Sequence, residues 1–408
     1  MSTVIDAPSD RLFRHAGYLK FVASRALSSL AFQGVGISLG WLVYDRTHNA
    51  FDLGFIGLAQ FLPMVVLTFL VGHVADRFDR RRIGLICQLI EAAAVTFLAA
   101  GIMMGWLTLP LIFASVALIG SAQAFERPTM AALLPGIVPA SLLQQAIATS
   151  TSFMQTAMVL GPSLGGLLYG VAPVAPFAVA SVLFLIASAC VIAIERPAPI
   201  ERREPVSLKS VFAGVAFIRG RPVILGTISL DLFAVLLGGA TALLPIYARD
   251  ILHAGPQSLG LLRASPAVGA VLMSIVLARR PLRHGVGMKM LTAVGVFGLG
   301  TLVFALSTNI ALSIAALFVL GAADTVSVVI RSSLVQLLTP DAMRGRVNAV
   351  NSLFIGTSNQ LGEFESGTVA GLIGAVPACI VGGIGTLLVV LLWTRLFPAL
   401  RKVDTLEG

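Results

Sequence analysis

Acidic residues lie inside several of the long apolar runs of this sequence, where their chemistry and depth suit proton transfer. Asp231 lies about nine residues into an apolar run that begins near residue 222, which is roughly 14 Å along a helix and near the middle of a bilayer. A carboxyl group in a medium of low dielectric can take up and release a proton near neutral pH. Asp231 is therefore the first candidate for a proton carrier. The further candidates are Glu363, Glu91, Asp324 and Glu365.

Arg25 is a basic residue about five positions into the first apolar run. Its guanidinium serves either as the counter-charge of Asp231 or as a clamp on an anionic or catecholate substrate. Asn359 and Gln360 add neutral polar groups at membrane depth, where such side chains line a cavity or join two helices. For every one of these charges the alternative is an ion pair that orients helices without titrating.

The stretch 72–82 is the most distinctive local pattern, and it reads Gly-His-Val-Ala-Asp-Arg-Phe-Asp-Arg-Arg-Arg. It joins two apolar runs and holds four arginines within six residues. Because an arginine costs about 3 kcal/mol at the bilayer centre, the turn must lie at a membrane surface. Short arginine-rich loops face the cytoplasm, so this turn sets the orientation of every other segment. Asp76 can pair with Arg80, one helical turn further on.

Apolar runs that position these residues recur along the whole chain of 408 residues. The chain is 57% hydrophobic and 12% charged, whereas a soluble chain carries about 25% charged residues. We therefore expect an all-α integral membrane protein with twelve spans, each long enough for a hydrocarbon layer of about 30 Å. The expected spans are 20–43, 53–75, 83–104, 108–126, 144–169, 174–194, 222–246, 257–278, 286–306, 310–332, 347–371 and 377–397.

The basic residues are distributed asymmetrically across these spans. If the arginine turn is cytoplasmic, the cytoplasmic segments hold 24 of the 28 lysines and arginines. This asymmetry predicts an even number of spans with both termini in the cytoplasm. The expected location is the bacterial inner (plasma) membrane. Although the net charge is +9, the basic residues do not gather on one face, so nucleic acid is not an expected partner. The polar first 20 residues do not resemble a signal peptide.

The longest polar break, 195–221, divides the spans into six and six. We expect a cytoplasmic segment 1–19, a six-helix bundle 20–194, a linker 195–221 with an amphipathic helix, a second bundle 222–397 and a cytoplasmic tail 398–408. The two halves also match in sequence. At an offset of 201, Leu133, Pro139, Gly161 and Gly166 fall on Leu334, Pro340, Gly362 and Gly367. Like-oriented repeats of six helices are typical of transporters with a central substrate site.

The arginine turn resembles a known signature, the cytoplasmic pattern Gly-x-x-x-Asp-Arg-x-x-x-Arg-Arg between spans two and three of the major facilitator superfamily. This resemblance implies a gating cluster that latches the two halves while the cavity is open outward. The members of that cluster are Gly72, Asp76, Arg77, Arg80, Arg81 and Glu126. Glu126 stands at the inner end of span four, where the superfamily has an acid. The alternative is a solvated basic turn that only sets the topology.

Span five contains a second pattern, Gly161-Pro162-Ser-Leu-Gly165-Gly166. It is similar to the motif of drug/proton antiporters in the same superfamily, although Ala157 replaces the leading glycine. Glycines four residues apart let helices approach closely, and Pro162 removes a backbone hydrogen bond. The resemblance implies a seal against proton leak, whereas tight packing alone accounts for the same residues.

Three further stretches resemble the siderophore-exporter and macrolide-efflux branch of transmembrane secretion effectors. They are Arg25-Ala-Leu-Ser-Ser, Trp41-x-x-Tyr44 with Leu53-Gly54, and Arg344-Gly345-Arg346-Val347. The expected function is proton-coupled efflux of a small amphipathic molecule, such as a siderophore or drug, through the lipid bilayer by a monomer. Proton symport, import and lysophospholipid transfer use the same architecture and stay open. A receptor or membrane enzyme is disfavoured, and neither a cofactor nor a metal is expected.

Overall fold

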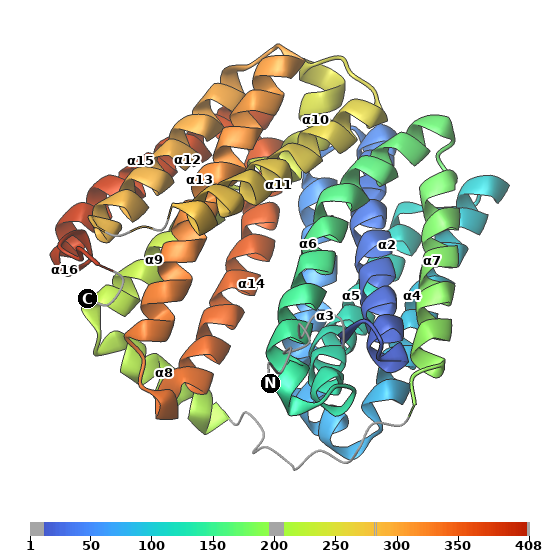
Figure 1. Cartoon of the computed structure of the whole chain (residues 1–408). Coiled ribbons are helices and arrows are strands. Elements are labelled where there is room, and N and C mark those ends of the chain that lie inside the picture. Colours follow the sequence, from blue (N-terminus) through green and yellow to red (C-terminus); the bar gives the residue numbers. More distant parts are fainter. Residues whose placement is uncertain (1–11, 196–207, 281, 283, 406–408) are drawn as a thin grey trace, which may run out of the picture. The chain divides into compact units, whose positions relative to one another are not determined.

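The computed structural model describes residues 12–195, 208–280, 282 and 284–405, and within these residues it is helical without a β-strand (Figure 1). Contacts between Cα atoms divide the chain into two compact units. Unit 1 comprises residues 1–42 and 59–205, and unit 2 comprises 43–58 and 206–408. The division after residue 205 falls within the predicted linker. The segment 43–58 was expected in the first bundle, but it clusters with unit 2 because the end of one helix and the start of the next contact that unit.

Six long helices begin in the first half of the chain. They are α2 (Ala16–Thr47), α3 (Ala50–Arg77), α4 (Arg80–Met104), α5 (Leu109–Leu133), α6 (Ala140–Val171) and α7 (Ala175–Ile192). Helices α2 and α3 each run from one unit into the other, at residues 42–43 and 58–59. Asp79 caps α4 by accepting a hydrogen bond from the Arg81 N–H at 2.9 Å, and Gly105 ends α4 at a φ of +74° that favours glycine.

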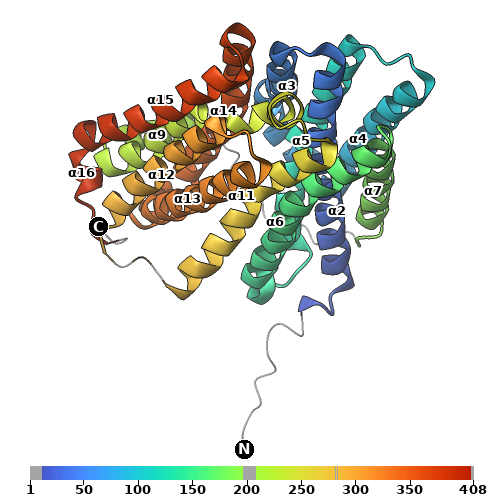
Figure 2. The ribbon, with the colours of Figure 1, turned by 90° about the horizontal axis from the view of Figure 1, so that it is seen from above.

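The second half begins with α8 (Leu208–Arg219), the predicted amphipathic helix, on which Phe212 is 70% exposed. The long helices that follow are α9 (Pro222–Leu237), α11 (Pro256–Arg279), α12 (Val286–Leu306), α13 (Ile310–Leu337), α14 (Asp341–Ile373) and α15 (Ala375–Leu396). Between α9 and α11 lie three short helical pieces, η2 (Ala240–Leu243), α10 (Leu244–Ile246) and η3 (Tyr247–Ile251), and α16 (Pro398–Arg401) follows α15. Helix α12 lies beside both α13 and α15 (Figure 2).

Ten helical stretches in the described part of the chain are long and apolar enough to cross a membrane. They correspond to ten of the twelve predicted spans. The other two predicted spans lie in α6 and α14, which have 32 and 33 residues and are not among these ten stretches. Both contain many polar side chains, among them Gln155 and Thr156 in α6 and Glu363 and Glu365 in α14. The twelve-span count therefore stays a prediction, whereas the all-α, multi-pass membrane architecture is established.

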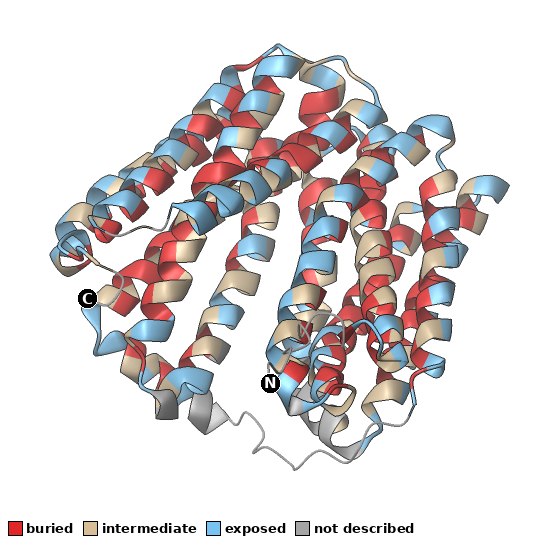
Figure 3. Cartoon of the chain, viewed as in Figure 1, coloured by how far each residue is buried: buried red, intermediate tan, exposed pale blue. Residues whose placement is uncertain are grey.

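Each unit has its own apolar core, and buried residues alternate with exposed ones along most helices (Figure 3). In unit 1 the beginning of α2 packs through Tyr18 and Phe21 against Met130 and Leu133 of α5. In unit 2 a corresponding cluster joins α9, α12, α13 and α15, with Trp393 of α15 among its members. Many of the exposed residues are large and apolar, as expected of helices that face lipid.

Candidate functional site

A polar cavity of about 170 Å³ lies within unit 1, between α2, α5 and α6. Its lining combines two arginines and one carboxylate with amide, hydroxyl, aromatic and thioether groups. The lining residues are Arg25, Ser28, Ser29, Phe32, Gln33, Gln123, Glu126, Arg127, Met154 and Met158. Small-molecule sites combine apolar surface with a few polar or charged groups, and this cavity has both, with the predicted residue Arg25 as one of its walls.

Glu126 is the centre of a buried hydrogen-bond network beside this cavity, with a side chain that is 1% exposed. Ser28 Oγ lies 3.0 and 3.1 Å from its two carboxylate oxygens. Gln88 Nε2 donates to Glu126 Oε1 at 2.9 Å and to Ser24 Oγ, while Gln123 Nε2 donates to Glu126 Oε2 at 2.9 Å. Three neutral groups therefore surround the carboxylate on α5, and they come from α2, α4 and α5 itself.

Glu91 on α4 extends the same network into the core. Gln123 Nε2, which already donates to Glu126, also donates to Glu91 Oε1 at 2.5 Å, so one amide bridges two carboxyl groups. Arg127 Nε donates in turn to Gln123 Oε1 at 2.8 Å. The second oxygen of Glu91 is buried and has no hydrogen-bond partner among the described residues. Sequence analysis proposed Glu91 as a proton carrier but did not connect it to Glu126.

Two arginines give the cavity a positive wall. The Arg25 guanidinium contacts Met154 Sδ at 3.0 Å, and the Arg127 guanidinium lies 5.2 Å from the centroid of the Phe32 ring. Within the described residues neither arginine forms an ion pair closer than 4.0 Å, so both guanidinium groups remain able to bind an anion. Arg25 is not the counter-charge of Asp231 in this structure, because that role belongs to Arg331.

The second buried charge cluster lies in unit 2, where Asp231 of α9 forms an ion pair with Arg331 of α13. Both side chains are less than 10% exposed. Asp324, also on α13, shares with Asp231 a cavity of about 10 Å³, which has room for about one water molecule. Ser327 Oγ lines this cavity without a hydrogen-bond partner in the described chain.

The remaining polar candidates lie on α14. Arg263 of α11 is 3.5 Å from Glu363 and also donates to the Thr241 carbonyl oxygen. Glu365 accepts a hydrogen bond from Ser366 at 3.3 Å. Asn359 is exposed, and the side chain of Gln360 lies outside the described residues. Neither glutamate of α14 therefore contacts the Asp231–Arg331 pair of the same unit.

The predicted gating cluster is only partly described, because the side chains of Gly72, Asp76 and Arg77 lie outside the described residues. Arg80 donates to the Ala132 carbonyl oxygen at 2.9 Å, and Arg81 donates to the carbonyl oxygen of Ile194. Glu126, which was expected to join them, bonds instead to the amides and the serine of the polar network. It lies within the bundle rather than at its rim, since its oxygens meet side chains of α2 and α4.

The glycine pattern of α6 packs directly on α2. A Cβ atom added at Gly165 would lie 2.5 Å from the Gly34 carbonyl oxygen, and one added at Gly161 would lie 2.5 Å from Gln33 Cβ. Pro162 and Gly166 are buried beside them. The close helix approach expected from the sequence is present, and it forms one wall of the bundle that holds the polar cavity.

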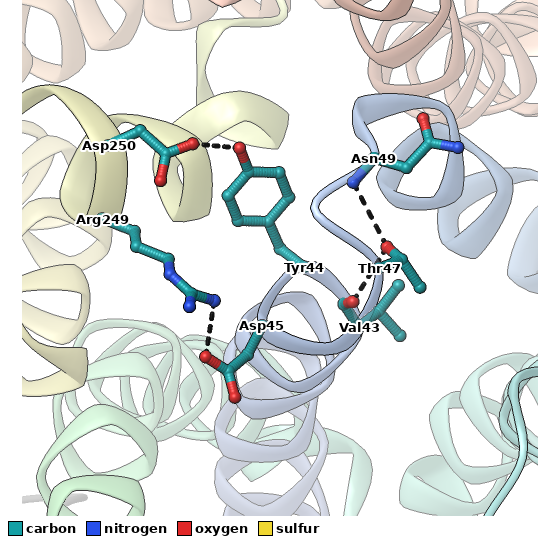
Figure 4. A network of polar contacts seen from close by, with 7 residues as sticks. All are labelled: Val43, Tyr44, Asp45, Thr47, Asn49, Arg249 and Asp250. Atoms are coloured by element: carbon teal, nitrogen blue, oxygen red, sulfur yellow. Dashed lines mark hydrogen bonds and ion pairs between the residues drawn. The ribbon is translucent and has the colours of Figure 1, made fainter.

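Sequence analysis missed a polar contact at the α2–α3 turn, at the opposite end of α3 from the arginines (Figure 4). Asp45 forms an ion pair with Arg249 at 2.5 Å, and Tyr44 donates a hydrogen bond to Asp250. All four residues belong to unit 2. A sequence signal existed, because the dipeptides Tyr44-Asp45 and Arg249-Asp250 place charged groups at two breaks between apolar runs. Nearby, a Cβ atom at Gly367 of α14 would lie 2.6 Å from Gly54 Cα.

No group of three or more His, Cys, Asp or Glu side chains in the described chain could hold a metal ion.

The profile of the transmembrane secretion effector family matches residues 15–407. The enterobactin exporter EntS of Citrobacter koseri is 25% identical over 401 residues, which cover 95% of this chain and 93% of that protein. An uncharacterised MFS-type transporter of Bacillus subtilis, YfiS, is also 25% identical, over 91% of each chain.

Among solved structures, a bacterial homologue of the human lysosomal transporter Spinster matches with a TM-score of 0.76 at 12% identity. The match covers 98% of this chain and 99% of that one, and at this identity it shows the fold alone. The relatives are transporters rather than enzymes, and together with the family match they agree with the helical, multi-pass architecture. This chain belongs to the transmembrane secretion effector family of major facilitator transporters.

Proposed function

We propose that this protein exports a small anionic, amphipathic molecule of the siderophore class and that the export is coupled to protons. The observation that carries the proposal is the cavity of unit 1, where Arg25 and Arg127 face Phe32 and two methionines. Guanidinium groups bind anionic oxygens and stack on aromatic rings, and methionine adapts to irregular apolar shapes. A catecholate ligand offers both acidic oxygens and a flat ring.

The relatives support the direction and the class of substrate. Enterobactin exporters match this chain over almost its whole length, and the motif Arg25-Ala-Leu-Ser-Ser that resembles this branch supplies two cavity residues, Arg25 and Ser28. We therefore assign this cavity as the part of the substrate site that unit 1 contributes.

For the proton, we assign Asp324 and Glu91 ahead of Asp231. The charge of Asp231 is neutralised by Arg331 in a buried ion pair, and this supports its alternative role as a paired charge that orients helices. No ion pair or hydrogen bond is present for Asp324 in the described chain, and Glu91 meets only an amide. Because a buried carboxylate without a direct partner costs several kcal/mol, a proton bound at either residue removes a charge that forms no ion pair within the described residues.

We further propose twelve spans in a monomer of the bacterial inner membrane, with both termini in the cytoplasm. The distribution of lysine and arginine supports this orientation. Cysteine labelling from each side of the membrane at positions 2 and 407 would test it, because termini that react from opposite faces would contradict the proposal.

The decisive experiment measures uptake of enterobactin into inverted membrane vesicles under an imposed proton gradient. We expect uptake that a protonophore abolishes. Arg25→Gln should weaken uptake at low substrate concentration, whereas Asp324→Asn and Glu91→Gln should leave downhill transport and remove the response to the gradient. Arg395→Gln, an exposed arginine outside the cavity, is the matched control. Uptake that is indifferent to the gradient would refute proton coupling, and wild-type behaviour of Arg25→Gln would refute the assigned site.

A further inference from the structure

A second and larger cavity, of about 540 Å³, opens in unit 1 where α3 ends and α4 begins. It lies between α3, α4 and α5 and shares no lining residue with the polar cavity. Ile83, Ile86 and Ile90 form one stripe of its wall along α4, at the spacing that keeps side chains on one face of a helix. Leu118 and Phe125 of α5 complete the apolar surface. This volume is typical of cavities that hold small ligands.

Charged groups occur at one end of this cavity, in the arginine turn. Asp79 and Arg82 line it there. The Asp79 carboxylate accepts the Arg81 N–H as the cap of α4, so part of its hydrogen-bonding capacity is already used. The two neighbouring arginines, Arg80 and Arg81, donate to backbone carbonyl oxygens. Arg82 differs from both, because its side chain is exposed and forms no hydrogen bond or ion pair in the described part of the chain.

An apolar groove that ends at an arginine whose side chain has no partner among the described residues matches a ligand that has an anionic head and a hydrocarbon tail. The position of the turn indicates which class of anionic ligand is available, since arginine-rich turns lie at the cytoplasmic surface of the membrane. Anionic lipids are present there, and basic pockets between helices on that side bind their headgroups. Ile86 and Leu118 are 55% and 46% exposed, so the groove is open at these residues, where the acyl chains of the membrane can enter it.

We propose that this cavity binds an anionic glycerophospholipid of the cytoplasmic leaflet. Arg82 binds the phosphate, and one acyl chain lies along Ile83, Ile86 and Ile90 against α5. A neutral or zwitterionic lipid supplies no net charge for Arg82, so the site prefers phosphatidylglycerol to phosphatidylcholine. The site is independent of the proposed substrate, because no residue of the export cavity takes part in it.

The test is native mass spectrometry of the full-length protein, purified in detergent with equal amounts of phosphatidylglycerol and phosphatidylcholine. We expect one retained phosphatidylglycerol. Arg82→Gln should reduce its retention about fivefold, which corresponds to the value of one arginine at an anionic surface. Arg395→Gln removes another exposed arginine, which lines neither of the two cavities of unit 1, and should leave retention unchanged. Ile86→Trp and Leu118→Trp, at two exposed positions, should each displace the lipid by filling the groove without altering the charge.

Equal loss in Arg82→Gln and Arg395→Gln would overturn the proposal, because it would indicate attraction by the overall charge. Retention that survives both tryptophan variants would overturn it as well, since the acyl chain would then lie elsewhere. Two outcomes would identify another occupant and also refute the lipid. One is a dimer without lipid, which would place a second copy in the groove. The other is a disulfide between Ile86→Cys and a cysteine on α14, in a chain that lacks its native cysteines.

Discussion

The two units surround their buried charged side chains with different kinds of partner. In unit 1, Glu126 and Glu91 are surrounded by serine and glutamine side chains, and the nearby arginines line an open cavity. In unit 2, Asp231 and Arg331 neutralise each other directly beside a cavity with room for about one water molecule. A closed ion pair has little capacity for a ligand, whereas an open positive wall retains one. This difference supports the proposal that the substrate binds in unit 1 and that the ion pair of unit 2 is mainly structural.

Removal of Arg331 should have the largest effect. Arg331→Met leaves Asp231 buried without a partner, which destabilises proteins by about 3–5 kcal/mol, so we expect little folded protein in the membrane. The double variant Asp231→Leu/Arg331→Met removes both charges and should recover most of the yield. Size-exclusion profiles and thermal melting in detergent measure both. If Arg331→Met is as stable as the wild type, the ion pair is not the structural element that we describe.

The arginines of unit 1 should affect substrate rather than stability. Arg25→Gln and Arg127→Gln each remove a charge-assisted hydrogen bond worth about 1.5–3 kcal/mol, so the dissociation constant for enterobactin should rise roughly ten- to hundredfold. Titration of the purified protein by tryptophan fluorescence gives the constant, and unchanged melting shows that the fold is retained. If Arg331→Lys, which keeps the charge, weakens binding more than Arg25→Gln does, the assignment of the two units is reversed.

Replacement of Glu126, whose hydrogen-bond partners are neutral side chains, should have a smaller effect. Glu126→Gln keeps the size of the side chain but places an amide against the donors of Gln88 and Gln123. Rotation of these amides can restore the hydrogen bonds, so we expect a loss of about 1 kcal/mol of stability. Transport should keep its dependence on the proton gradient, because the proposed proton carriers are Asp324 and Glu91. A loss of stability as large as that of Arg331→Met would show that Glu126 is an ionised structural charge.

Loss of the partly exposed pair at the α2–α3 turn should cost less. Asp45 and Arg249 are 47% and 31% exposed, and pairs of this kind contribute about 0–1 kcal/mol. Asp45→Asn should hardly change melting, but it should weaken the attachment of 43–58 to unit 2. The rate of amide hydrogen exchange in this segment should increase in Asp45→Asn. It should fall back to the wild-type rate in the charge-swapped pair Asp45→Arg/Arg249→Asp. Unchanged exchange in Asp45→Asn would show that the Tyr44–Asp250 bond and the glycine contact suffice.

The smallest effect concerns an exposed contact outside the membrane spans. Asp404 lies 2.9 Å from His284 Nδ1 and accepts the Gly285 N–H at 2.8 Å, and these hydrogen bonds hold the pKa of Asp404 below its usual value of 3.8. Its contribution to stability is therefore present above the ordinary pKa and disappears as the pH falls through the lowered one. The melting temperature of Asp404→Asn should lie slightly below that of the wild type at pH 7, and the difference should shrink towards pH 3. A constant difference would contradict this role.

The membrane class, ten of the spans, the family and the identity of the ionisable residues followed from the sequence. Apolar runs and short basic turns are local properties that persist in any arrangement of the helices. Arg25, Asp231, Glu91 and Asp324 were recognised as special because a charge inside an apolar run is costly wherever it points.

The pairing of these charges was decided only by the tertiary structure. Asp231 and Arg331 are 100 residues apart and on different helices, so no spacing rule joins them, and Arg25 was an equally reasonable partner. The same holds for Glu126, whose neighbours on α2 and α4 meet it only because the helices pack in one order and rotation. Each residue's cost of burial is a property of its own chemistry, but its partner depends on the three-dimensional position of side chains that are distant in the chain.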